Sequence, residues 1–378
     1  MSIITYLTQI RFGSGAIGEL AEDVAALAIR RPLIVTDKGV IAAGLLEKLT
    51  AVLPPEVATV YSEVSSNPTE EEALAGLAVY RAAGCDGLIG FGGGSPIDLA
   101  KAIAILAGHP QPLAQYALID GGLARITAAV APVIAIPTTA GTGSEVGRAA
   151  LINLADGRKV GLISPHLIPR RAVCDPDLTL GLPPYLTAAT GMDALSHCIE
   201  TLLSPRFNPP AEAIALDGAA RIVRHLEAVV TDGGDINGRS ELMMGALEGG
   251  LTFQKGLGAV HGLSHALGAL RHLALHHGTL NAVLLPPVLR FNAGHADDKY
   301  RRLALALDLS EDADLASFFE GLNARIGLPR SLAEMGVPAD VIDDVAVKAA
   351  ADHSTPTSPR PCTAEDYRAL LRASIGPA

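Results

Sequence analysis

The stretch Gly90-Phe91-Gly92-Gly93-Gly94-Ser95-Pro96-Ile97-Asp98 decides the fold class of this 378-residue chain. It follows the strand-like run Gly87 to Phe91 and opens a helical pattern, Ser95 to Ala107. Three consecutive glycines let a ligand approach the backbone closely. Ser95 can cap the helix, Pro96 fits its first turn, and exposed N–H groups there would attract a diphosphate. The string is not GxGxxG, and a plain tight turn is the alternative interpretation.

The same strand–helix alternation runs through the first half of the chain. The strand-like runs are Leu33 to Val35, Val57 to Tyr61, Gly87 to Phe91 and Val133 to Ile136. An amphipathic segment to about Val52 follows the first run. A helix from Thr69 to Ala83 follows the second, and Thr69 with Glu72 has capping-box spacing. This alternation predicts an α/β N-terminal domain with a parallel, Rossmann-like sheet that binds ligands at the carboxyl ends of its strands.

The pattern changes near the prolines of Gly181-Leu182-Pro183-Pro184. Beyond them the sequence has no convincing series of strands. The expected helices are Thr187 to Leu203, Pro210 to Val230, Arg239 to Thr252 and His261 to Leu270. We therefore predict a dinucleotide-binding α/β domain over residues 1–182 and an all-α, metal-binding C-terminal domain over residues 183–378.

Composition excludes several classes of protein. The net charge is −11 and there is no basic block, which argues against a nucleic-acid surface. The longest apolar stretch, Ala128 to Pro137, is too short to span a bilayer. Met1 to Gly13 shows no signal-peptide pattern, and the four cysteines form no CxxC pair. We expect a reduced, cytoplasmic protein without a membrane or nucleic-acid partner.

Polar residues follow two further strands of the predicted sheet. Asp37 comes after the first strand, where a carboxylate can bind the adenosine ribose and repel a 2′-phosphate, which favours NAD over NADP. A solvated turn residue is the alternative interpretation of Asp37. Thr138-Thr139-Ala140-Gly141-Thr142-Gly143-Ser144 places hydroxyl groups and flexible backbone after a third strand.

Histidines and a carboxylate recur at helical spacing in the second half. Asp193 and His197 are four residues apart, and so are His261 and His265, so each pair shares a helix face. The pair His276-His277 follows after a loop. A carboxylate with two or three imidazoles can hold Fe²⁺, Zn²⁺ or another first-row divalent ion.

Four motifs, in order, resemble the iron-containing (group III) alcohol dehydrogenases. They are Gly92-Gly93-Gly94-Ser95-Pro96-Ile97-Asp98-Leu99-Ala100-Lys101, Pro137-Thr138-Thr139-Ala140-Gly141-Thr142-Gly143-Ser144-Glu145-Val146, Ala189-Thr190-Gly191-Met192-Asp193-Ala194-Leu195-Ser196-His197 and Gly256-Leu257-Gly258-Ala259-Val260-His261-Gly262-Leu263-Ser264-His265. The resemblance runs from about Thr36 to Asn292, and the ending from Asp352 to Leu371 is also similar.

The resemblance implies a set of site residues. The implied ligands of one divalent metal, Fe²⁺ before Zn²⁺, are Asp193, His197, His261 and His277. His265 would lie beside the metal, as a proton relay or as a hydrogen-bonding neighbour. The implied contacts to NAD are Asp37, Asn67, Gly93, Gly94, Ser95, Thr138, Thr139, Thr142, Ser144 and Lys159. The interval before His277-Gly278 is longer than the family pattern, so His276 is the alternative fourth ligand.

Within the family, the strings Ala28 to Val40 and His276 to Val283 look most like those of 4-hydroxybutyrate dehydrogenases. This resemblance implies hydride transfer between a primary alcohol, such as a short hydroxy acid, and NAD, in a homodimer or larger homo-oligomer. Arg148 and Lys255 are the candidate partners of a substrate carboxylate, although both could be surface charges or internal ion-pair partners. The rival hypotheses are a metal-dependent lyase of the dehydroquinate-synthase type and a non-catalytic nucleotide-binding protein.

Overall fold

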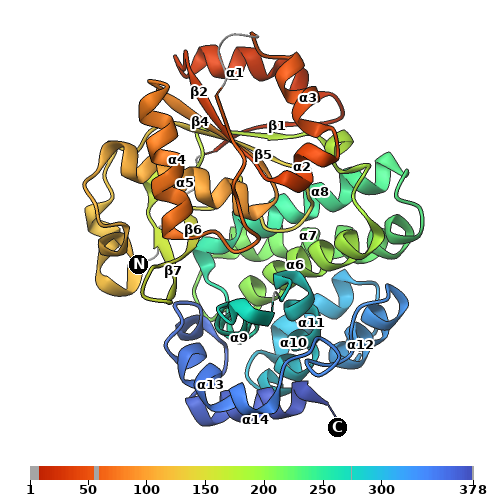
Figure 1. Cartoon of the computed structure of the whole chain (residues 1–378). Helices are drawn as coiled ribbons and strands as arrows, with labels where there is room; N and C mark the ends of the chain where they lie inside the picture. The colour runs from red at the N-terminus through yellow and green to blue at the C-terminus, as the bar shows by residue number, and fades with distance from the viewer. Residues whose placement is uncertain (1–7, 55–58, 274, 377–378) are drawn as a thin grey trace. The chain divides into compact units, whose positions relative to one another are not determined.

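The computed structural model describes residues 8–54, 59–273 and 275–376. The chain divides into two compact units, and the division falls between Gly181 and Leu182. The unit that ends at Gly181 contains a sheet with helices, and the unit that begins at Leu182 is built from helices (Figure 1). Each unit is described by itself below.

The first unit has these strands and helices: β1 Gln9–Phe12, α1 Leu20–Ala26, β2 Pro32–Val35, α2 Lys38–Ala42, α3 Leu45–Ala51, β3 Thr59–Tyr61, α4 Glu70–Ala82, β4 Gly87–Gly92, α5 Gly94–Gly108, β5 Val133–Pro137, β6 Ala149–Asn153, β7 Lys159–Ile163 and β8 Arg171–Cys174. In the described residues its main sheet has six strands in the order β1-β8-β5-β4-β2-β3, and every paired neighbour runs parallel. The predicted parallel sheet is therefore confirmed.

Alternating side chains of this sheet join two different cores. On β2, Leu33 and Val35 join a core with α4 and α5, whereas Ile34 joins a second core with α1 and α3. Successive residues of a strand point to opposite faces, so a strand covered on both sides reads as a continuous apolar run. This accounts for the uninterrupted runs in β2, β4 and β5.

Several sequence-based boundaries change in detail. The amphipathic segment after β2 forms two helices, because Gly44 between them adopts a φ of 72°. The capping box of Thr69 and Glu72 is present at the start of α4. The predicted strand from Val57 is described only from Thr59, since residues 55–58 lie outside the described part.

The hairpin β6–β7 was not predicted. Its two strands pair antiparallel as a separate two-stranded sheet. Asp156-Gly157 lies at the turn between them, and Gly157 has a φ of 87°. An Asp-Gly pair between two apolar runs is a hairpin signal, so the sequence did carry the information.

The second unit contains the helices α6 Pro184–Leu203, α7 Pro209–Thr231, α8 Ile236–Leu251, α9 Ala259–Gly268, α10 His277–Asn292, α11 Asp297–Ala306, α12 Leu315–Arg325, α13 Ile342–Ala350 and α14 Ala364–Ile375. No strand occurs in the described residues beyond Leu182, as predicted. Every residue of α6 from Thr187 to Leu203 is buried, so this helix is the centre of the unit. Among the described residues, no helix combines the length and the apolar character needed to span a bilayer.

Candidate functional site

The carboxyl ends of β2, β4 and β5 lie side by side in the first unit. Val35 is in register with Gly90, and Gly92 is in register with Pro137. The backbone N–H of Thr138 donates to the carbonyl of Gly92 at 2.9 Å. Three predicted cofactor segments, which begin at Asp37, Gly93 and Thr138, therefore share one edge of the sheet.

Asp37 lies next to the glycine-rich loop. Its Oδ1 accepts a hydrogen bond from the N–H of Val40 at 2.9 Å, so Asp37 caps α2. A Cβ placed on Gly92 would lie 3.4 Å from Asp37 Oδ2. The carboxylate thus combines a capping role with a place beside the loop.

The first turn of α5 differs from the sequence-based expectation. Its N-cap is Gly93 rather than Ser95, and no side chain caps it. Ser95 lies inside the first turn, and its hydroxyl donates to the carbonyl of Ser66 at 2.7 Å. Because Ser95 does not cap, the first-turn N–H groups keep the donor character that attracts an anion.

Threonines of the loop after β5 lie directly against this turn. A Cβ on Gly94 would come within 2.7 Å of Thr142 Cγ2, and a Cβ on Gly93 would lie 3.7 Å from Thr139 Oγ1. A side chain at position 94 would therefore force Thr142 to shift. Gly94 therefore allows the two loops to meet.

The hairpin adds Lys159 to the same region. Its ammonium group donates to Asn67 Oδ1 at 2.9 Å, and Asn153 Nδ2 donates to the carbonyl of Asn67 at 3.2 Å. The predicted pair Asn67 and Lys159 is thus brought together, 92 residues apart in sequence.

Ser144 is committed to an internal network. Its hydroxyl donates to Asp98 Oδ1 at 2.6 Å and accepts from Lys101 Nζ at 2.8 Å. Lys101 is fully buried and also donates to the carbonyls of Ser144, Gly147 and Ala149. Burial lowers the pKa of Lys101 to about 8, although Asp98 and Glu145 oppose the shift. The Ser144 hydroxyl thus fixes the loop, and α5 holds that loop in place.

In the second unit, Asp193 and His197 lie on one face of α6. Asp193 Oδ1 is 3.7 Å from His197 Nε2 and 3.9 Å from His261 Nε2 of α9. All three side chains are buried, and their ligand atoms lie within 4.8 Å of one another. Three of the four predicted metal ligands therefore lie close together.

His277, at the start of α10, joins them. Its Nε2 is 3.6 Å from Asp193 Oδ1. A Cβ on the following Gly278 would come within 2.2 Å of the carbonyl oxygen of Ala189, so only glycine allows α10 to approach α6 so closely. His276 instead caps α10, where its Nδ1 accepts from the N–H of Thr279 at 3.4 Å. The geometry favours His277 over His276.

One carboxylate oxygen and three imidazole nitrogens at these positions fit a divalent first-row ion. Carboxylate and imidazole donors suit Fe²⁺ and Zn²⁺ alike. Uncompensated carboxylates are costly to bury, and a cation at this point would neutralise Asp193. The donor set therefore fits the metal that the sequence implies.

Glu200 was missed by the sequence reasoning. It lies on α6 seven residues after Asp193, and its Oε2 is 2.5 Å from His261 Nδ1. Its Oε1 accepts from the N–H of Val260 at 2.7 Å, at the start of α9. The spacing Asp193, His197, Glu200 continues one helix face, so helical periodicity was the available signal.

His265 lies beside this cluster. Its ring stacks on the His277 ring with centroids 5.5 Å apart, and its Nδ1 is 3.1 Å from Asp352 Oδ2. Burial lowers the pKa of His265 to about 4, although Asp352 opposes that shift. Burial alone would raise the pKa of Asp352, but His265 holds it below its usual range. Asp352 fixes the ring orientation of His265.

The structure does not support Lys255 as a partner of the substrate. Lys255 is 1% exposed, and its ammonium group donates to the carbonyls of Thr201, Leu202 and Ser204. Glu212 Oε1 lies 3.4 Å from the same ammonium group. Burial lowers the pKa of Lys255 to about 7. This lysine caps the last carbonyls of α6, so its charge is used inside the protein.

Arg148 lies just before β6 and is half-buried. Its carbonyl accepts from the N–H of Ser164 at 3.1 Å, which ties the loop to the segment after β7. The role of Arg148 toward a substrate carboxylate stays a prediction.

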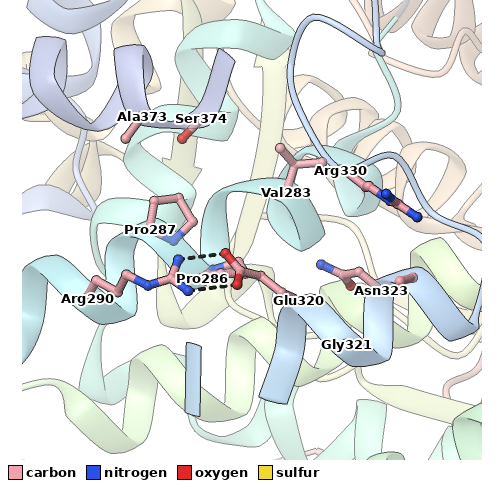
Figure 2. A pocket seen from close by; sticks show the side chains of 11 residues that line it. Val283, Pro286, Pro287, Arg290, Glu320, Gly321, Asn323, Arg330, Ala373 and Ser374 are labelled. Carbon is pink, nitrogen blue, oxygen red and sulfur yellow. Dashed lines mark hydrogen bonds and ion pairs between the residues drawn. The ribbon is translucent and has the colours of Figure 1, made fainter. Parts of the chain in front are cut away.

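A separate pocket of about 540 Å³ lies among α10, α12 and α14. Arg290 and Glu320 pair with each other there (Figure 2). The two hydrogen bonds between them are 2.6 and 2.7 Å long. Val283, Pro286 and Pro287 form much of its apolar wall. None of the predicted site residues lines this pocket, so it is distinct from the metal cluster.

Comparisons with known proteins cover the whole length of the chain. Residues 8–176 match the family described as "Iron-containing alcohol dehydrogenase", and residues 187–375 match "Fe-containing alcohol dehydrogenase family, C-terminal". A 4-hydroxybutyrate dehydrogenase from Cupriavidus necator is 52% identical, over 99% of this chain and 100% of the relative.

Solved structures of related enzymes are also similar to this chain over its full length. The crystal structure of a 1,3-propanediol oxidoreductase has a TM-score of 0.92 and 33% identity, and covers 99% of this chain and 100% of its own. A sulfoacetaldehyde reductase from Bifidobacterium kashiwanohense, in complex with NAD⁺, has a TM-score of 0.89 and 25% identity, with 100% and 99% covered.

Proposed function

Because the chain belongs to the iron-containing alcohol dehydrogenase family, a family of NAD-dependent, metal-containing oxidoreductases, we propose that it interconverts 4-hydroxybutyrate and its semialdehyde. The observation that carries the substrate is the 52% identity over the full chain to a 4-hydroxybutyrate dehydrogenase. The reaction converts a primary alcohol and NAD⁺ to an aldehyde, NADH and a proton.

Asp193, His197, His261 and His277 are the proposed metal ligands. Support comes from the short distances between Asp193 Oδ1 and the three imidazole Nε2 atoms. Bound there, a divalent cation supplies Lewis acidity toward the alcohol oxygen, and NAD supplies the hydride acceptor. The protein contributes by holding these side chains in a buried, converging arrangement.

The NAD diphosphate is proposed to bind the first turn of α5. Gly93, Gly94 and Ser95 would offer backbone N–H groups, and the uncapped helix start supports this role. Thr138, Thr139 and Thr142 would close over the cofactor. Lys159 with Asn67, and the backbone at Ser144, complete the proposed contacts.

Asp37 is proposed to select NAD over NADP. Its carboxylate would accept hydrogen bonds from the ribose and repel a 2′-phosphate. Replacing Asp37 with glycine should raise kcat/KM with NADP relative to NAD. If the wild type already favours NADP, this assignment is wrong.

His265 is proposed as the residue that accepts the hydroxyl proton. Its Nδ1–H faces Asp352 Oδ2, so the neutral ring presents Nε2 as a proton acceptor. Asp352 would hold the ring in the tautomer that this transfer needs.

Arg148 is the proposed partner of the substrate carboxylate. A guanidinium group can bind a carboxylate with two parallel hydrogen bonds, and Arg148 closely follows the loop assigned to the cofactor. A hydroxy acid would then be held by its charged end and oxidised at the other.

We further propose a cytoplasmic homo-oligomer without a nucleic-acid partner. The four free cysteines support a reducing compartment, and the net charge of −11 supports the absence of a nucleic-acid partner.

A kinetic panel tests this function. Metal-reconstituted protein should reduce NAD with 4-hydroxybutyrate at a higher kcat/KM than with 1-butanol, measured by the absorbance of reduced nicotinamide. Equal efficiency with both substrates would contradict the hydroxy-acid assignment and leave the alcohol dehydrogenase activity intact.

A further inference from the structure

Asn281 is the one non-ligand side chain of the described residues that hydrogen-bonds to Asp193 inside the proposed metal cluster. It follows His277 by four residues on α10, so both side chains share one helix face. Asn281 is fully buried, and its Nδ2 lies 2.7 Å from Asp193 Oδ1. The same nitrogen is 3.3 Å from His261 Nε2 and 3.3 Å from His277 Nε2.

Two of these neighbours identify which end of the amide faces the cluster. Asp193 Oδ1 is a hydrogen-bond acceptor, and so is His261 Nε2, because the Nδ1–H of His261 donates to Glu200. Only the NH₂ end of the amide can donate to them, so the surroundings fix the orientation of the Asn281 side chain. Its Oδ1 is buried and has no hydrogen-bond partner among the described residues.

The orientation that places the Asn281 NH₂ group among the ligand atoms therefore leaves Oδ1 without a hydrogen-bond partner among the described residues. An unsatisfied buried carbonyl costs free energy, and a fold keeps such a group where another interaction outweighs the cost. Here that interaction is the hydrogen bond from the Asn281 NH₂ group to the buried carboxylate of Asp193.

We propose that Asn281 is a positioning residue for the metal. Its two N–H groups hold Asp193 and the imidazole of His261 together before a cation arrives, with His277 Nε2 beside the same nitrogen, and the hydrogen bond to Asp193 remains afterwards. This inference rests on the proposed ligand set. It predicts that Asn281 stabilises the metal-free protein and strengthens metal binding.

Asn292 offers a matched control. It lies on the same helix, is 3% exposed, and also has a buried Oδ1 without a hydrogen-bond partner among the described residues. It is eleven residues further along, about 16 Å along the helix axis. Asn292→Ala should therefore change the stability of the metal-free and metal-loaded protein equally, with no effect on metal affinity.

The test uses the full-length protein stripped of metal and titrated with Co²⁺, whose visible spectrum reports the coordination geometry. Asn281→Ala should weaken Co²⁺ binding by about 10–100-fold in competition with a chelator, and should alter the visible bands. Its metal-free Tm should fall by several degrees. Asn292→Ala should keep the wild-type Co²⁺ affinity and spectrum.

A second variant gives the opposite sign for one readout. Asn281→Asp would place a carboxylate against Asp193, so its metal-free Tm should fall below that of Asn281→Ala. The added negative charge should bring Co²⁺ affinity back above that of Asn281→Ala. The inference is overturned if Asn281→Ala and Asn292→Ala behave alike, or if Asn281→Asp raises the metal-free Tm.

His261→Ala separates this inference from the ligand assignment. If His261→Ala binds Co²⁺ like the wild type, the proposed ligand set is wrong. If His261→Ala loses Co²⁺ but Asn281→Ala binds Co²⁺ with the wild-type affinity, the ligand set stands and the role of Asn281 fails.

Discussion

Glu200 Oε2 lies 2.5 Å from His261 Nδ1, and this contact joins α6 and α9, two of the three helices that carry the proposed metal ligands. A carboxylate at Nδ1 fixes the imidazole tautomer and leaves the Nε2 lone pair for a metal. The other oxygen of Glu200 binds the N–H of Val260, at the start of a helix whose N-cap, Gly258, has no side chain to do so. One side chain therefore orients a ligand and anchors its helix.

Replacing Glu200 with glutamine keeps the size and removes the charge. We expect metal affinity to fall about 10–100-fold, because the imidazole loses its charged acceptor. Competition with a chelator measures this directly. Unchanged affinity in a folded Glu200→Gln protein would show that the contact serves the fold alone.

Lys101→Met tests the buried anchor of the loop that carries Thr138 to Ser144. Methionine fills similar space but cannot donate to the carbonyls that Lys101 holds. Hydrogen bonds from a charged donor contribute roughly 1.5–3 kcal/mol, so KM for NAD should rise by one to two decades. Metal affinity is the control and should stay unchanged, since Lys101 belongs to the first unit. A wild-type KM for NAD would argue against this role.

Arg148→Ala tests the proposed carboxylate contact. KM for 4-hydroxybutyrate should rise by about one to two decades, from the roughly 1.5–3 kcal/mol of a charge-assisted contact, while 1-butanol changes little. Lys255→Met is the comparison, because its ammonium group is used within the protein. That variant should lower Tm without changing the ratio of the two KM values. The assignment fails if Arg148→Ala affects both substrates equally.

Glu248 predicts a pH dependence of stability. Two causes raise the pKa of Glu248 from 4.5 to about 8: burial has the larger effect, and the neighbouring Asp217 has the next largest. Between these values the unfolded chain has lost the proton that the folded protein retains, so the contribution of Glu248 to stability falls as pH rises. Glu248→Gln should therefore gain stability over the wild type between pH 5 and pH 8, measured by urea unfolding. If the free energy of unfolding differed between the variant and the wild type by the same amount at pH 5 and at pH 8, this prediction would be wrong.

The sequence predicted the elements whose signals are local. Continuous apolar runs identified β2, β4 and β5, and the spacing of Thr69 and Glu72 identified the start of α4. The i, i+4 pair on α6 was also readable. These features depend on neighbours within about one turn or one strand.

Features that depend on tertiary contacts were missed. Ser95 looked like a helix cap, but its hydroxyl bonds to Ser66 in another loop. Lys255 looked like a candidate for substrate binding, but it caps α6 from a distant segment. Glu200 and Asn281 carried the helical spacing of their neighbours, and only the approach of α6, α9 and α10 gives that spacing a meaning.

Metal content of His261→Ala tests the central claim most directly. His261 is 1% exposed and its Nε2 faces Asp193, so alanine should remove one ligand and leave the others in place. We predict that this variant, reconstituted with Fe²⁺ or Zn²⁺, retains no stoichiometric metal and no NAD-linked oxidation of 4-hydroxybutyrate, while the wild type holds one ion per chain. Full metal occupancy in folded His261→Ala would contradict the account.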